Sequence, residues 1–182
     1  MDRDVVLSGH LHEAEQHLME MVNEERRAGE YYLAAVVQDS LVYSLHGWAG
    51  SIALPQVGQR AAELAVRCAH RGVGGHRFAV HEAVRGAYHA LINLGGAPAE
   101  MASAVATGAM AAVSEAEREA AADLTDAIVS GLCAAAADLG LDPAWMHELA
   151  AQAVSRGVAG RPDAMDGAWR GEDDGRAAQA FS

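Results

Sequence analysis

The sequence predicts an all-α protein, a helical bundle of about seven helices arranged as repeated helix-loop-helix hairpins. Three observations support this class. Apolar residues recur at intervals of three and four along most of the chain, which is the period of an amphipathic helix. Hydrophobic residues make up 51% of the 182 residues but aromatic residues only 5%, so the alanine-rich core must form by close approach of small side chains, as between packed helices. Glycines and prolines divide the chain into segments of helical length.

The first hairpin is expected over residues 4–47. Five apolar residues at alternating spacings of four and three share one face of a helix over 4–27: Leu7, Leu11, Ala14, Leu18 and Met21. Gly29 marks the end of this helix, and a second helix follows over 30–47. Because no proline separates the two segments, one long helix is the alternative, and we favour the hairpin.

Prolines open three of the five remaining helices, which are expected over 55–71, 76–94, 98–113, 115–139 and 143–156. Pro55, Pro98 and Pro143 suit the first helical position, because the N–H group there has no partner within the helix. Glycines follow the helices that end at 71 and 94, and glycine is a common residue just after a helix.

The same prolines mark an internal repeat of hairpins over residues 55–157. They lie 43 and 45 residues apart, and the segment Leu94-Gly95-Gly96-Ala97-Pro98 resembles Leu139-Gly140-Leu141-Asp142-Pro143. We therefore expect a single all-α domain over 1–160. The segment over 161–182 has no apolar period, so we expect a tail that is flexible or becomes ordered on a partner.

The charge balance narrows the classes of partner. The chain has 25 acidic and 13 basic residues and a net charge of −12, which disfavours binding to nucleic acid because phosphate is repelled. No run of about 18 uncharged apolar residues predicts a membrane span, and the N-terminus lacks the pattern of a secretory signal. We expect a cytoplasmic protein that contacts another protein or copies of itself.

A polar stripe on the first hairpin is the main candidate site. On the first helix, His and Glu recur at spacings of three and four beside the apolar seam, and Asp39 and His46 lie on the second helix. In an antiparallel hairpin that reverses near Gly29, His17 would lie opposite Asp39 or Ser40. Helical bundles bind metals through such inward side chains. The candidate ligands are His10, Glu13, His17, Glu20, Asp39 and His46.

Two interpretations of this stripe are open. A mixed histidine and carboxylate set would suit iron, manganese or zinc, and a carboxylate set would suit magnesium. Alternatively the stripe is a solvated boundary between core and water, which we favour because charged side chains usually flank the apolar face of a surface helix.

The same two helices resemble part of a known family. Glu13, Glu20 and Glu24 resemble the glutamate cluster on the first helix of the all-α nucleoside triphosphate pyrophosphatases of the MazG type, and Asp39 resembles the aspartate of their E-x-x-D motif. The resemblance covers about half of the chain and implies a magnesium-dependent nucleotide pyrophosphohydrolase. The sequence departs from the motif because Val36 stands where the family has its glutamate, so one carboxylate for the metal is missing.

A glycine-rich loop before the helix at 76 is a second candidate. Gly74, Gly75 and Arg77 would bind phosphate through backbone N–H groups and the guanidinium. The similar Arg-Gly-Val-Ala-Gly at 156–160 favours ordinary helix termination instead.

The sequence contains no complete catalytic set. We therefore expect a binding or assembly protein that acts through protein–protein contacts, with homo-oligomers as one form of such contact. The alternatives are the metal-dependent nucleotide pyrophosphohydrolase of the MazG type and a histidine and carboxylate bundle that binds metal.

Overall fold

A computed structural model describes residues 3–28, 32–72, 76–116 and 121–159, and every regular element in these ranges is helical. The all-α class is confirmed. The helices are α1 (Arg3–Ala28), α2 (Leu33–Leu45), α3 (Leu54–Gly72), α4 (His76–Asn93), α5 (Pro98–Ala116), α6 (Ala121–Asp138) and α7 (Pro143–Ala159), and a short 3-10 helix, η1 (His46–Trp48), follows α2. The predicted tail over 161–182 lies outside the described residues.

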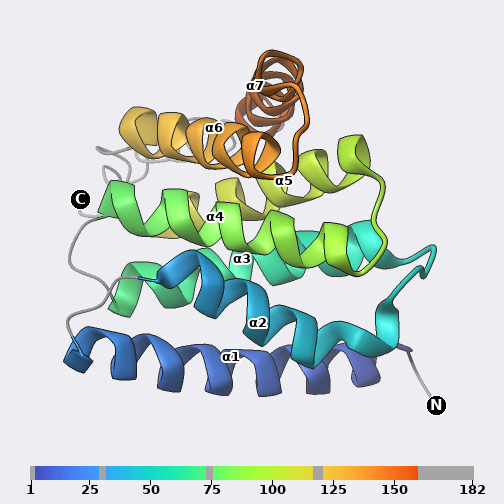
Figure 1. The fold of residues 1–182 in the computed structure, drawn as a ribbon, viewed down its shortest axis with the longest axis vertical. Coiled ribbons are helices and arrows are strands. Elements are labelled where there is room, and N and C mark those ends of the chain that lie inside the picture. Colours follow the sequence, from blue (N-terminus) through green and yellow to red (C-terminus); the bar gives the residue numbers. More distant parts are fainter. Residues whose placement is uncertain (1–2, 29–31, 73–75, 117–120, 160–182) are drawn as a thin grey trace, which may run out of the picture.

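The helices stack in two rows (Figure 1). The first row runs α1, α3, α5, α7, and the second row runs α2, α4, α6, with each helix packed on the next in its row. The two helices of each hairpin, α1–α2, α3–α4 and α5–α6, pack across the rows. Helical-repeat proteins are built in this way, with each unit burying its apolar faces on its neighbours. The first hairpin is therefore two helices, as predicted, and not one long helix.

The corners after α4 and after α6 are alike and lie 45 residues apart. Gly95 has a φ of 86° and Gly140 a φ of 69°, in the left-handed region that glycine adopts without strain. At each corner the N–H of the following residue donates to the carbonyl five residues earlier, at 3.0 Å in the first case and 2.8 Å in the second. This is the Schellman pattern of helix ends. The predicted repeat is confirmed at these corners.

A hydrogen bond from a side chain also stabilises each of these two corners, and the two donors lie at equivalent positions of the repeat. The Tyr88 hydroxyl donates to the Pro98 carbonyl at 3.3 Å, and 45 residues later the Cys133 thiol donates to the Pro143 carbonyl at 3.6 Å. Burial raises the pKa of Tyr88 to about 12 and also raises the pKa of the Cys133 thiol. Both groups therefore remain protonated donors at neutral pH.

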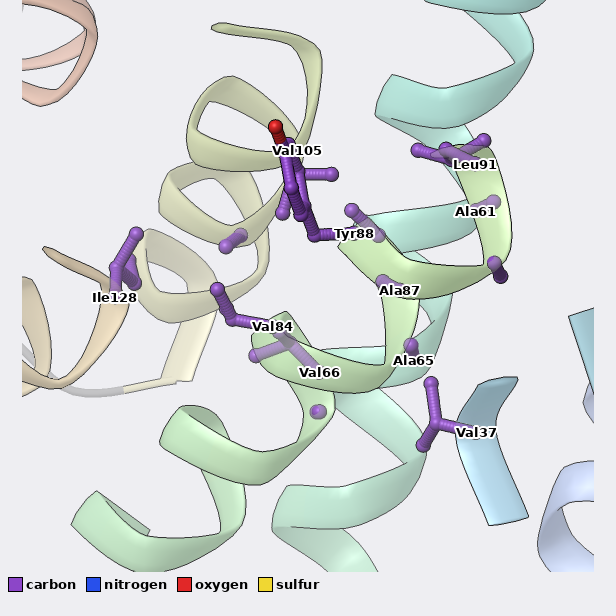
Figure 2. Packing of buried hydrophobic residues seen from close by; sticks show 14 of the residues in the cluster. Val37, Ala61, Ala65, Val66, Val84, Ala87, Tyr88, Leu91, Val105 and Ile128 are labelled. Carbon is purple, nitrogen blue, oxygen red and sulfur yellow. The ribbon is translucent and has the colours of Figure 1, made fainter. Parts of the chain in front are cut away.

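Glycines let neighbouring helices in each row approach very closely. A Cβ atom on Gly131 of α6 would lie 2.6 Å from the His81 carbonyl oxygen of α4, and one on Gly108 of α5 would meet the Gln59 carbonyl of α3. Small residues fill the space between the rows as well, where Ala61, Ala65 and Ala87 are fully buried (Figure 2). The core is thus made by close helix approach, as the composition predicts.

Within the described part of the chain, no helix is long and apolar enough to cross a membrane.

Candidate functional site

The structure places the predicted metal ligands on α1, on α2 and at the start of η1. Glu13, Glu20, Asp39 and His46 are exposed, and His10 and His17 are half-buried. The His10 Nδ1 atom lies 3.8 Å from Glu13 Oε2 on the same helix, so this pair is local.

The ring contact between α1 and α2 involves His17 and Tyr43. The His17 ring packs on the Tyr43 ring, with centroids 6.0 Å apart, so His17 lies beside a residue one turn beyond Asp39. The His46 Nδ1 atom lies 2.8 Å from the carbonyl oxygen of Tyr43. Among the described residues, no group of three or more His, Cys, Asp or Glu side chains is placed to hold one metal ion. The metal site stays a prediction.

The predicted phosphate loop is only partly described. Arg77 is exposed on the first turn of α4, whereas Gly74 and Gly75 lie outside the described residues. This site also stays a prediction.

A surface groove lies between α3 and α5, lined by residues that the structure describes. It has a volume of about 620 Å³. Its walls come from the loop before α3, from the first two turns of α3 and from the first half of α5. The lining residues are Ile52, Pro55, Gln56, Gln59, Glu100, Ser103, Ala104 and Thr107.

The local sequence explains why this space is open. Gly108 brings the backbone of α5 against α3 at Gln59, and the groove lies on the N-terminal side of that contact. There α5 presents Ser103, Ala104 and Thr107, whose side chains are short. Close contact at one end and short side chains beyond it leave a hollow between the two helices.

The loop before α3 holds Ile52 at the rim of the groove. The Gly50 N–H donates to the Leu94 carbonyl at 2.8 Å, which ties this loop to the corner after α4. The Ala53 N–H donates to Ser51 Oγ at 3.2 Å, so the loop is also bonded internally. Between these two anchors, Ile52 is 101% exposed. A fixed loop that presents a fully exposed isoleucine is a candidate contact for a partner.

The polar side chains of the groove differ in how they are bonded. The Thr107 hydroxyl donates to the Ser103 carbonyl at 2.8 Å, as threonines in helices commonly do. In contrast, the side chains of Gln56, Gln59 and Glu100 make no hydrogen bond or ion pair with another described residue. Two amides and one carboxylate at the groove are therefore available for hydrogen bonds or an ion pair with a partner.

A second polar cluster lies across the second row, and its members pair with one another. Arg85 Nε of α4 donates to Asp138 Oδ2 of α6 at 2.6 Å, and His89 Nε2 lies 3.3 Å from the same oxygen. The His89 Nδ1 atom is 3.3 Å from the side-chain oxygen of Gln38 on α2. Hydrogen bonding to Arg85 lowers the pKa of Asp138. This cluster links three helices of the second row.

Sequence reasoning missed the groove. Its residues form no motif, because the groove depends on which faces of α3 and α5 meet. The available signal was Ile52, an apolar residue in a short connection between helices, and a lone apolar residue there is too common to predict a site.

No protein-family model, curated protein or solved structure matches this chain. The resemblance to the MazG type has no support from these comparisons and stays a prediction.

Proposed function

We propose that the protein is a helical-repeat binding module that holds a segment of a partner polypeptide in the groove between α3 and α5. The observation that carries this proposal is the groove itself, about 620 Å³ in volume and bordered by the fully exposed Ile52. Stacked hairpins commonly provide binding surfaces along their rows. The partner is a segment of another protein, because two copies of a chain with a net charge of −12 repel each other at long range.

The composition of the groove fits a peptide better than a small apolar ligand. Gln56 and Gln59 can each donate to a peptide carbonyl and accept from a peptide N–H. Ile52 offers an aliphatic contact that excludes water when a partner covers it. Since a stable interface buries about 800 Å² on each partner, the groove is the anchor of a larger contact.

We place this module in the cytoplasm. In support, neither Cys68 nor Cys133 forms a disulfide, as is usual in a reducing compartment.

A site-directed photo-crosslink tests the proposed function. In one variant, a photoreactive amino acid replaces Gln56 in the groove. In the control variant, it replaces Gln152, which is exposed on α7. We expect a discrete adduct from position 56 and none from position 152. The crosslinked protein is then identified and purified, and its affinity is measured for the unmodified chain and for Ile52→Ser.

The expected result is at least about a tenfold loss of affinity in Ile52→Ser, which corresponds to about 1.4 kcal/mol. Equal adducts at both positions, no adduct at position 56, or an unchanged affinity would contradict the proposal.

A further inference from the structure

We infer that the partner segment in the groove is cationic, with an arginine or lysine that pairs with Glu100 while its aliphatic part packs on Ile52. This inference rests on the proposed function, because it names the chemistry of the segment that the groove would hold.

The charge around the groove supports this partner. Glu100 is the single ionisable residue among the lining residues, and none of them is basic. It is exposed, and no ion pair among the described residues involves it. The whole chain carries a net charge of −12, which attracts cations at long range. A cationic segment is therefore drawn to the molecule and finds an unpaired carboxylate in the groove.

Glu100 also lies in the first turn of α5, where a carboxylate interacts favourably with the helix dipole. Any carboxylate in the first turn of a helix interacts with the dipole in this way, and Asp123 does so in α6. Glu100 differs because it shares a hollow with a fully exposed isoleucine and two unbonded amides. The interaction with the helix dipole therefore explains why a carboxylate stands at this position. It leaves the oxygen atoms of Glu100 available to accept hydrogen bonds.

The groove matches the two halves of an arginine or lysine side chain. These side chains bury an aliphatic stem on apolar surface while the charged head stays near water. Ile52 provides the apolar contact, and Glu100 accepts from the head group, in a bidentate manner for arginine. Gln56 and Gln59 then bond the backbone of the segment, which favours a polypeptide over a free amine.

Selection from a random decapeptide library tests this inference without a known partner. Peptides are selected on the unmodified chain, and those that also bind Ile52→Ser are removed, so that the remainder depend on the groove. We expect these peptides to be enriched in arginine or lysine next to an aliphatic residue. Their affinities are then measured for Glu100→Gln and for the control Asp126→Asn, which removes one charge from an exposed position on α6 in the second row.

We expect Glu100→Gln to weaken the selected peptides about fivefold, the size of one partly exposed charge-assisted bond, and Asp126→Asn to change affinity less than about 1.5-fold. Equal losses in both variants would show attraction by net charge alone and would overturn the inference. Groove-dependent peptides that are neutral or acidic would also overturn it, while the proposed function stands. If no groove-dependent peptide is enriched, the inference fails, while the proposed function is decided by the photo-crosslink at position 56.

Discussion

The contact between α4 and α6 and the contact between α3 and α5 are built alike, since each sets a glycine against a backbone carbonyl of the neighbouring helix. They differ in the polar groups beside the glycine. In the second row, Arg85 and Asp138 bond to each other across the contact. In the first row, Gln56 and Glu100 border an open groove without such a partner. The same packing device thus supports a contact that holds the fold together and one that is available for binding.

Among the groups that form the two contacts, the glycine gives the largest expected effect on stability. Gly131→Ala should lower the free energy of unfolding by about 2 kcal/mol, because the added Cβ would lie 2.6 Å from a backbone oxygen and force α6 away from α4. Alanine is otherwise the better helix former by about 1 kcal/mol. Urea denaturation measures the change.

Gly9→Ala on α1 is the matched control, since nothing lies within 4 Å of an added Cβ there. It should raise the stability by up to about 1 kcal/mol. A stability gain of the same size in Gly131→Ala would show that close approach does not govern the second row.

The paired cluster of the second row gives a smaller effect. Asp138→Asn should lower the free energy of unfolding by about 0.5 kcal/mol at neutral pH, because the side chains of Arg85 and Asp138 are 34% and 33% exposed and the pair is partly screened. Urea denaturation of the variant and the unmodified chain gives the difference. Asp126→Asn on the exposed face of the same helix should leave the stability almost unchanged.

The same pair predicts a dependence on pH. Hydrogen bonding to Arg85 holds the pKa of Asp138 below its ordinary value of 3.8. A carboxyl with a lowered folded pKa stabilises the fold above its unfolded pKa, and this contribution is lost as the pH falls through the folded pKa. The stability difference between the unmodified chain and Asp138→Asn should therefore shrink below about pH 4. A difference that stays constant on acidification would contradict the pairing.

The sequence predicted most of the fold because its signals are local. Pro98 and Pro143 open α5 and α7 as expected, and α3 begins at Leu54, one residue before Pro55. Boundaries without a proline were less accurate. The sixth helix was expected from residue 115, but α5 continues to Ala116 and α6 begins at Ala121. Alanine-rich sequence favours helix on both sides of such a connection and does not mark where one helix ends.

The candidate sites were harder to predict because they depend on register and on which helix faces meet. We expected His17 opposite Asp39 from a reversal near Gly29. The second helix begins at Leu33, three residues later than expected, and the ring contact of His17 is with Tyr43, about one turn beyond Asp39. The groove arises because Gly108 selects the face of α5 that meets α3, and no period in the sequence indicates that choice.

A substitution in the groove should have the smallest effect on the free energy of unfolding. This is the clearest expected difference between the groove and the second row. Ile52→Ser should change the free energy of unfolding by less than about 0.5 kcal/mol, because the side chain has no contact to lose when it is fully exposed. Leu54→Ala, two residues away, should cost about 3 kcal/mol, since Leu54 is only 2% exposed. Urea denaturation of both variants tests the contrast. A large loss of stability in Ile52→Ser would show that Ile52 supports the fold, and its exposure could then no longer be attributed to binding.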